Sequence, residues 1–285
     1  MPTPASITHT SSTSPTSCTE STTSTHCVVI PSYNSGRLLQ TTVESVLSLG
    51  LTVFAVTDGS TDGSDSFLDA PAYESHPLLH VIRFRKNQGK GAAALAGMQA
   101  AFEHNFTHAV LFDSDGQHAA SDIPAMIGIS NEHPDRMVLG KPIFGDDAPL
   151  ERVHARRIAN WFANLSARRT FIADSLFGFR VYPIRHALEC LRETTRGRAF
   201  DFETQIAVRL AWRGVSAINF PTRVTYPARD KGGVSHFDYV RDNLLLIRSH
   251  AGLLAQAFFS RRIRLGRSRA AQETIARELP PFPAG

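Results

Sequence analysis

Four short apolar runs, each followed at once by a cluster of polar residues, constrain most strongly how this chain folds. The runs begin at Cys27, Leu51, Leu78 and Ala109, and stretches with apolar residues at helical spacing separate them. Strands that alternate with helices predict a mostly parallel α/β sheet joined by right-handed crossovers. Ligands bind beyond the carboxyl ends of the strands in such sheets, so the four polar clusters are expected to share one functional edge.

The same patterns predict further elements along the chain. Beyond about residue 142 the alternation weakens, although helical and strand-like stretches still follow. We expect strands over residues 27–30, 51–56, 78–84, 109–112, 137–139 and 215–220, and helices over 38–47, 91–104, 123–130, 151–168, 200–212 and 239–265.

A chain of 285 residues is long enough for one large domain with appendages. The three cysteines follow no paired or metal-ligand spacing, which favours a reducing compartment and argues against a disulfide scaffold or a structural zinc. No run of 18 apolar residues occurs, which argues against a transmembrane helix. We expect a disordered Ser/Thr-rich leader over residues 1–26, a single α/β domain over 27–237, an amphipathic basic helix over 238–270 and a flexible tail over 271–285.

The formal net charge of +4 is concentrated near the C-terminus. The stretch between Asp238 and Arg269 contains seven arginines and two aspartates, so the rest of the chain is about neutral. This distribution argues against a nucleic-acid-binding domain, whose basic surface would extend over the core. An amphipathic basic helix suits an anionic membrane interface, here expected on the cytoplasmic face. The alternative is a helix that covers the sheet and keeps its arginines in water.

Asp113 and Asp115 flank one small residue directly after the fourth apolar run. Two carboxylates so placed can hold Mg²⁺ or Mn²⁺, which takes one or two protein oxygens together with water and substrate phosphates. The amide oxygen of Gln117 can supply a further ligand. The alternative is a capped turn, since Asp, Ser and Gly favour turns for local reasons. A calcium loop fits badly, because Gly116 comes too early and no distal Glu follows at the required spacing.

Two further clusters suit a nucleotide. Asp58, after the second run, can accept hydrogen bonds from a base or a ribose, or it can close a tight turn. Lys90 precedes a helix whose N-terminus favours an anion, so it can meet a phosphate. The residues around Lys90 match neither a P-loop nor a G-x-G-x-x-G fingerprint, which weakens the case for a kinase or a dehydrogenase.

Taken in order, these motifs resemble family-two glycosyltransferases of the GT-A fold, a Rossmann-like, mixed and mostly parallel sheet flanked by helices. The likeness is greatest to the dolichol- or polyprenyl-phosphate sugar synthases and spans roughly residues 27–235. A looser match continues through residues 174–180 and 202–203. The strong part rests on Val-Val-Ile-Pro-Ser-Tyr-Asn from Val28, Thr-Asp-Gly-Ser-Thr-Asp from Thr57, Asn-Gln-Gly-Lys-Gly-Ala-Ala from Asn87 and Phe-Asp-Ser-Asp-Gly-Gln-His from Phe112.

The resemblance implies a metal-dependent hexosyltransferase that inverts the anomeric carbon. It would move a sugar from a nucleotide-diphosphate sugar to a lipid-linked acceptor, and a polyprenyl phosphate is the acceptor expected first. The implied site has Pro31, Tyr33 and Asp58 lining the nucleoside pocket, Asp113 facing the ribose or diphosphate, and Asp115 and Gln117 binding the metal.

Three positions depart from the family pattern. Ser35 stands where the family usually has an acidic residue, and Thr57 replaces the first of two aspartates. Where relatives have Gly-Ser-Arg after the fifth strand, this chain has Gly140-Lys141-Pro142. A cation is therefore expected beside the donor at Lys141, without the forked geometry of a guanidinium.

Glycosyl transfer passes through an oxocarbenium-like state, so the main catalytic need is to stabilise the departing nucleotide diphosphate. Asp115 is expected to serve this need through the metal, and no residue is expected to act as a covalent nucleophile. An acceptor phosphate is already anionic, whereas an acceptor hydroxyl needs a general base. Asp174 and Glu203 are the candidates for that base; alternatively, Asp174 caps a turn and Glu203 lies on a solvated helix face.

Acceptor contacts are expected from the later part of the chain. Arg156, Arg180 and Arg229 can hold a phosphate by forked hydrogen bonds, or they can be solvated surface residues. Ser235 lies in a glycine-containing loop over residues 232–237, which is expected to close over donor and acceptor.

Other functions stay open at this point. A sugar-phosphate nucleotidyltransferase would also bind a nucleotide and Mg²⁺, but its glycine-rich basic loop after the first strand is missing here. A non-catalytic nucleotide-sugar or lipid-surface binding module is a second alternative, although Asp113, Asp115 and Gln117 are all present. Among acceptors, a lipid or pigment hydroxyl is the alternative to polyprenyl phosphate.

Overall fold

A computed structural model of the protein describes residues 25–144, 150–168, 170–192, 201–224 and 239–259. The expected leader lies outside these residues except at its end, where the first strand begins at His26. The expected tail, the loop over residues 232–237, Arg229 and Ser235 also lie outside the described residues.

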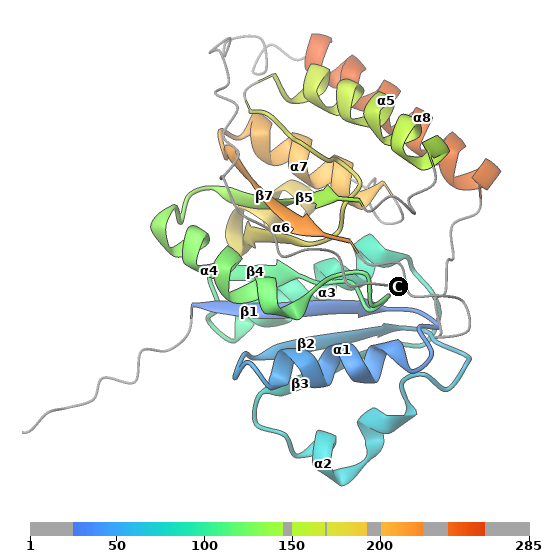
Figure 1. The fold of residues 1–285 in the computed structure, drawn as a ribbon, viewed down its shortest axis with the longest axis vertical. Coiled ribbons are helices and arrows are strands. Elements are labelled where there is room, and N and C mark those ends of the chain that lie inside the picture. Colours follow the sequence, from blue (N-terminus) through green and yellow to red (C-terminus); the bar gives the residue numbers. More distant parts are fainter. Residues whose placement is uncertain (1–24, 145–149, 169, 193–200, 225–238, 260–285) are drawn as a thin grey trace, which may run out of the picture.

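The core of the molecule is a seven-stranded sheet in the order β3-β2-β1-β4-β6-β5-β7 (Figure 1). Every pair of neighbouring strands is parallel except the two pairs that β6 makes with β4 and β5. The mostly parallel α/β sheet predicted from the sequence is therefore confirmed. The strands are β1 (His26–Ser32), β2 (Val53–Asp58), β3 (Leu79–Phe84), β4 (His108–Leu111), β5 (Met137–Ile143), β6 (Arg180–Pro183) and β7 (Ala217–Arg223).

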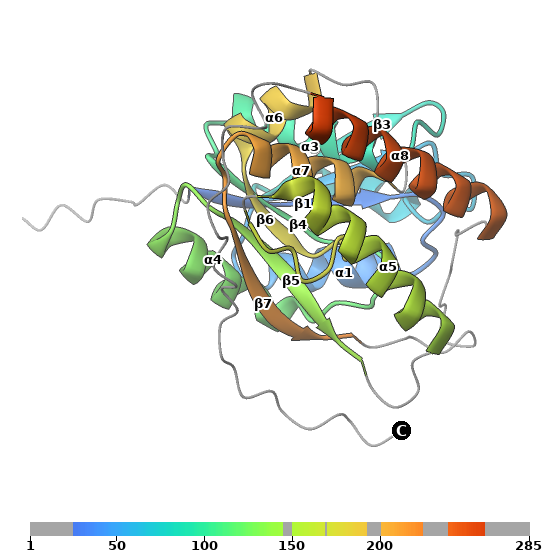
Figure 2. The same cartoon turned by 90° about the horizontal axis from the view of Figure 1, so that it is seen from above.

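Helices cover both faces of this sheet, as Figures 1 and 2 show. Helices α1 and α4 lie on one face, α3, α6 and α7 lie on the other, and α5 and α8 form an outer layer beyond α7. The helices are α1 (Leu38–Leu47), α2 (Pro71–Glu74), α3 (Lys90–Glu103), α4 (Ile123–Glu132), α5 (Leu150–Ala167), α6 (Ile184–Arg192), α7 (Phe202–Trp212) and α8 (Tyr239–Phe259), with short 3₁₀ turns η1 (Ser66–Asp69) and η2 (Ala120–Asp122).

The central strands bury their side chains on both faces of the sheet. In β1, Cys27 and Val29 join the core under α3, while Val28 and Ile30 join the core under α1. Strands buried on both faces consist of continuous apolar residues rather than an alternation of apolar and polar ones. This is why the apolar runs of the first half of the chain predicted the strands correctly.

Two neighbouring elements, β6 and α6, were not expected. The sequence of β6 begins with Arg180 and ends with Pro183, so it lacks the apolar run that marks the other strands. The strand is stabilised by neighbours distant in sequence, because it inserts antiparallel between β4 and β5. As a result the beginning of β6, not its end, lies at the edge of the sheet where β4 ends.

Helix α8 begins where the amphipathic basic helix was expected. It packs against α5 and α7, and the side chains it buries there include His250, Leu253 and Ala257. Helix α8 therefore covers part of the fold, as the alternative to a membrane-bound helix predicted. Within the described residues, no helix combines the length and the apolar character that a membrane crossing requires.

Candidate active site

The polar clusters meet at the carboxyl edge of the sheet, as the sequence predicts. Strand β1 ends at Ser32, β2 ends at Asp58, and Asp113 follows two residues after the end of β4. The antiparallel β6 begins at Arg180, which pairs with Leu111 of β4, so the loop before β6 joins the same edge. Residues from the first and the second half of the chain therefore share one rim.

Asp58 fixes the loop that precedes α3. Its two carboxylate oxygens accept the backbone N–H groups of Gln88 and Gly89, at 2.7 and 2.8 Å. Gly59 allows this close approach, because a Cβ at that position would lie only 2.6 Å from the backbone nitrogen of Asn87. The structure thus gives Asp58 a positioning role, and its contact with the nucleoside stays a prediction.

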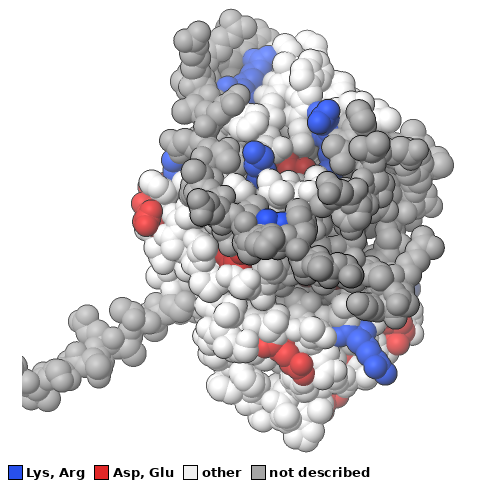
Figure 3. Space-filling model, viewed as in Figure 1, with Lys and Arg blue, Asp and Glu red and all other residues white. Residues whose placement is uncertain are grey.

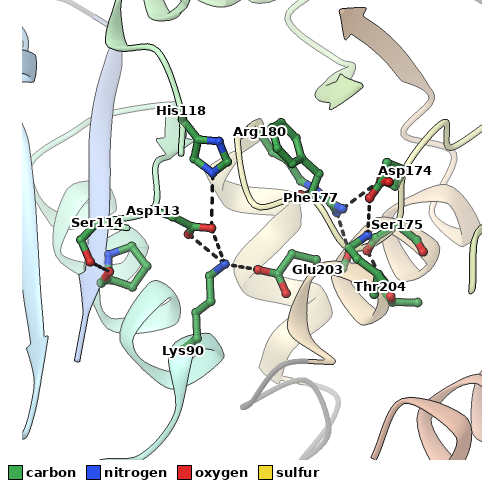
Figure 4. A network of polar contacts seen from close by, with 12 residues as sticks. Lys90, Asp113, Ser114, His118, Asp174, Ser175, Phe177, Arg180, Glu203 and Thr204 are labelled. Atoms are coloured by element: carbon green, nitrogen blue, oxygen red, sulfur yellow. Dashed lines mark hydrogen bonds and ion pairs between the residues drawn. The ribbon is translucent and has the colours of Figure 1, made fainter. Parts of the chain in front are cut away.

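Lys90 lies between two carboxylates that come from different halves of the chain (Figure 4). Its Nζ is 2.8 Å from both carboxylate oxygens of Asp113, and it also forms an ion pair with Glu203 at the start of α7. Burial would lower the pKa of Lys90, but the two carboxylates raise it above its ordinary value. Lys90 is therefore a stable cation, and the prediction that it meets a donor phosphate is not tested by these contacts.

The same cluster holds Asp113 in its ionised form. Burial would raise the pKa of Asp113, but the Lys90 ammonium and the His118 imidazole hold it well below its ordinary range. Nε2 of His118 lies 3.5 Å from Oδ2 of Asp113. Gly178, in the loop before β6, packs so closely that a Cβ there would come within 2.1 Å of Oδ2 of Asp113.

Asp115 has the properties expected of a cation ligand. Burial raises its pKa, and the charge of Asp113 raises it further. Its Oδ1 accepts the backbone N–H of Gln117 at 3.0 Å, so the loop is folded back on itself. Bringing a divalent cation between Asp113 and Asp115 would relieve the repulsion between the two carboxylates.

This donor set fits one type of metal site. Among the described residues, no three His, Cys, Asp or Glu side chains are arranged to hold a metal ion. The described residues therefore do not form a metal site that is coordinated by protein side chains alone. Two carboxylates and an amide match a Mg²⁺ or Mn²⁺ ion that completes its coordination with water and substrate phosphates.

Asp174 forms an ion pair with Arg156, with 2.8 Å between Oδ1 and NH1. The same carboxylate oxygen accepts the backbone N–H of Leu176, which closes a short turn. The turn cap that was the alternative for Asp174 is therefore present. Glu203 does not lie on a solvated helix face, because it is buried and paired with Lys90. A general-base role for Asp174 or Glu203 stays a prediction.

Arg180 contradicts the acceptor role expected for it. The side chain is completely buried, and its guanidinium donates to the carbonyl groups of Asp174, Phe177 and Glu203 and to the hydroxyl of Tyr182. A guanidinium whose N–H groups are used in this way cannot also clamp a phosphate. Arg180 instead ties the loop before β6 to the first turn of α7.

Ser35, which stands where the family usually has an acidic residue, belongs to a chain of hydrogen-bonded hydroxyl groups. Ser35 is buried, and its Oγ lies 2.9 Å from Oγ of Ser32 and 2.7 Å from Oγ of Ser114. Ser114 in turn donates to the carbonyl oxygen of Pro31. Neutral hydrogen bonds thus connect the loop after β1 with the loop that carries Asp113 and Asp115, where an acid would have placed a buried charge.

Two further predicted site residues, Tyr33 and Lys141, follow or belong to strands of the same sheet. Tyr33 follows β1 at the rim, and its contact with a nucleoside is untested. Lys141 lies on β5, opposite Pro221 of β7, and β6 separates its strand from β4. Its contact with a donor phosphate therefore stays a prediction.

Neither His118 nor Gly178 was assigned a role of its own from the sequence, although each lies in a motif that carries the family resemblance. His118 is packed among the rings of Phe112, Phe177 and Phe179, with ring centroids 4.6 to 5.7 Å away. The only signal for His118 was its place at the end of the Asp-Ser-Asp-Gly-Gln-His segment. The Phe-Gly-Phe segment around Gly178 gave no local sign that it packs against Asp113.

A parallel sheet with a two-carboxylate loop beyond β4, completed by an antiparallel strand, is the arrangement of a GT-A glycosyltransferase. The chain belongs to glycosyl transferase family 2, whose family model matches residues 27–188. This confirms the family that the sequence motifs indicated.

Curated relatives and solved structures agree with this assignment. The polyprenol monophosphomannose synthase of Mycolicibacterium smegmatis is 25% identical over 211 residues, which is 72% of this chain and 78% of that protein. The undecaprenyl-phosphate mannosyltransferase of Micrococcus luteus is 24% identical over 215 residues, 72% of this chain and 84% of that protein. Glucosyl-3-phosphoglycerate synthase from Mycobacterium tuberculosis, solved with Mn²⁺, UDP and its product, aligns with a TM-score of 0.55 at 16% identity, covering 81% of this chain and 79% of that one. That likeness shows the fold alone.

Proposed function

We propose that this glycosyltransferase moves a sugar from a nucleotide-diphosphate sugar to a polyprenyl phosphate, with inversion at the anomeric carbon and with a divalent cation. The observation that carries the proposal is the loop with Asp113, Asp115 and Gln117 at the carboxyl edge of the sheet. The two relatives described above support the acceptor class, because their names specify lipid phosphates as the molecules that receive the sugar.

In this proposal Asp113, Asp115 and Gln117 hold Mg²⁺ or Mn²⁺. The ion, when bound, acts as a Lewis acid on the leaving diphosphate. Lys90 contributes a fixed positive charge beside Asp113, and Asp58 keeps Lys90 in place through the backbone of the preceding loop. Charge that develops on the departing diphosphate is best stabilised by groups already in position, because no reorganisation is then needed during the reaction.

The acceptor side lies around Asp174 and Arg156. Asp113, Lys90, Glu203 and Asp174 follow one another across the rim in Figure 4. Arg156 pairs with Asp174 through one of its terminal nitrogens, and its remaining N–H groups can contact an acceptor phosphate. Because a phosphate oxygen is already anionic, this acceptor needs no general base. With a hydroxyl acceptor, Asp174 would have to take up the proton.

We also infer that the enzyme works as a peripheral protein at the cytoplasmic face of a membrane. A polyprenyl chain keeps its acceptor in the lipid phase, so the transferase must reach the surface at which the phosphate is exposed. The basic stretch between Asp238 and Arg269 supports contact with anionic lipid.

The test is transfer from a panel of radiolabelled nucleotide sugars to purified polyprenyl phosphate or to the matching polyprenol, with Mn²⁺ or with EDTA. We expect sugar on the phosphate, none on the alcohol, and no transfer in EDTA. Asp115→Asn should reduce the rate at least 100-fold without unfolding the protein. Glu189→Gln is the control, because Glu189 on α6 is partly exposed and pairs with Arg213, just past the end of α7 that lies opposite Glu203. Transfer to the alcohol alone would favour the hydroxyl acceptor, and unchanged activity of Asp115→Asn would reject the metal site.

A further inference from the structure

The outer layer formed by α5 and α8 exposes large apolar side chains. The ring of Phe162 lies 5.8 Å from that of His250, and the guanidinium of Arg168 lies 4.4 Å above the ring of Phe258. The two helices therefore run side by side in the same direction, as Figures 1 and 2 show. Their exposed apolar residues are Ile158, Trp161 and Leu165 on α5 and Ile247, Phe258 and Phe259 on α8.

Helix α8 carries apolar residues on two of its sides. One side, which includes Leu253 and Ala257, is buried against the fold. The other side carries Ile247, Ala251 and Phe258 at helical spacing and is exposed. Exposed apolar side chains that lie together in this way, beside those of α5, are typical of a site of interaction.

Helix α5 connects this outer surface with the rim. On its inner side, Arg156 pairs with Asp174, and the side chain of Asn160 bonds to Ala173 and Ser175 in the loop before β6. On its outer side, Trp161 is 61% exposed, one residue after Asn160. The helix that contacts the acceptor side of the site thus also carries an exposed aromatic ring on its opposite face.

The charges around the apolar residues are of one sign. Arg157 and Arg248 are exposed beside them, and neither the stretch 156–168 nor the stretch 245–259 contains Asp or Glu. Figure 3 shows several blue patches over the upper part of the molecule where it is not grey, with a red patch beside the lowest of them. A second copy docked by two-fold symmetry would bring arginines against arginines, whereas an anionic surface would neutralise them.

We propose that α5 and α8 together form a docking surface for an anionic lipid bilayer. The apolar side chains enter the interface between headgroups and acyl chains, and the arginines contact the headgroups. This inference rests on the proposed lipid-phosphate acceptor, because the acceptor chain stays in the bilayer while its phosphate reaches Arg156 on the inner side of α5. It assigns to α5 a membrane contact that the sequence predicted for the C-terminal helix alone.

The test uses the full-length chain and flotation with vesicles of phosphatidylcholine, with or without phosphatidylglycerol. Trp161→Glu and Ile247→Glu should each weaken binding to the anionic vesicles about tenfold or more. Phe102→Glu on α3 is the matched control, because Phe102 is also an exposed apolar residue but lies on another helix. In a Trp212→Phe background, Trp161 is the single remaining tryptophan, and its emission should shift to shorter wavelength when anionic vesicles are added.

Several results would overturn the inference. One is equal loss of binding with Phe102→Glu, and another is unchanged emission from Trp161. A third is a wild-type dimer that Trp161→Glu dissociates without any vesicle binding, since this would make a second copy the cover. Sugar transfer to a short-chain, water-soluble prenyl phosphate separates the two proposals. Absent vesicle binding with intact transfer rejects only the docking surface, whereas vesicle binding without transfer to any prenyl phosphate rejects only the proposed function.

Discussion

Replacing Gly178 with alanine tests whether close packing sets the position of the Asp113 carboxylate. A Cβ at residue 178 would lie 2.1 Å from Oδ2 of Asp113 and 2.8 Å from Nζ of Lys90. Ordinary contact begins at 3.4 Å, so the carboxylate must move by roughly 1 Å. Gly178 does not have a positive φ, so alanine strains no backbone and any effect comes from this displacement.

The size of the effect follows from which atoms must move. The obstructing atoms are the ends of two side chains, so the shift relieves most of the overlap, and the stability cost should be only about 1 kcal/mol. The group that moves is the carboxylate that is proposed to hold the ion and face the donor. A misplacement of about 1 Å at a reacting centre lowers kcat by about 100-fold. Activity should therefore fall far more than stability.

The assay combines urea denaturation with steady-state transfer rates at saturating donor. Gly128→Ala is the matched control, because Gly128 lies within α4 and a Cβ there meets no atom within 4 Å. It should keep wild-type activity and gain up to about 1 kcal/mol of stability. A Gly178→Ala enzyme within twofold of the wild-type rate would refute the argument. So would a loss of activity that global unfolding fully explains.

Two further predictions concern buried polar side chains. Burial, assisted by the charge of His108, lowers the pKa of His26 from 6.5 to about 4. At pH values between about 4 and 6.5, the unfolded chain therefore binds a proton at His26 that the folded chain does not bind. The free energy of unfolding should therefore fall by about 2 kcal/mol from pH 7 to pH 5 in urea titrations, and a His26→Gln variant with the same pH slope would contradict this. Arg180→Lys should lower the free energy of unfolding by about 3 kcal/mol, because a single ammonium cannot serve the buried carbonyl groups that the guanidinium serves. Near-native stability with weaker acceptor binding would instead restore the acceptor role of Arg180.

The first half of the chain was predictable because its strands depend on local sequence. The apolar run of β1 and the polar residues after it predict both the strand and its functional end, since a central parallel strand is buried on both faces. Sheet topology then brings Asp58 and Asp113 to one rim without any further information. For this reason the sequence correctly predicted that Asp58 and Asp113 lie at the ends of their strands.

The second half depends on contacts between segments far apart in sequence. Arg180 looks like a surface cation until the carbonyl groups of Asp174 and Glu203 are placed around it. The pairing of Glu203 with Lys90 spans more than one hundred residues and leaves no local signature. Periodicity and motif spacing are local properties, so they predict the metal loop but not the network that supports it.

The ammonium group of Lys90 is shared by one carboxylate from each half of the protein, and this sharing has a thermodynamic consequence. A ligand that draws Asp113 away leaves the whole of that charge to Glu203, next to the proposed acceptor side. Binding at the two sides is then linked through a common ion, and linkage acts equally in both directions. Whatever free energy donor binding adds to acceptor binding, acceptor binding adds to donor binding, so a favourable coupling lowers the population of half-filled enzyme relative to the empty and the fully occupied forms.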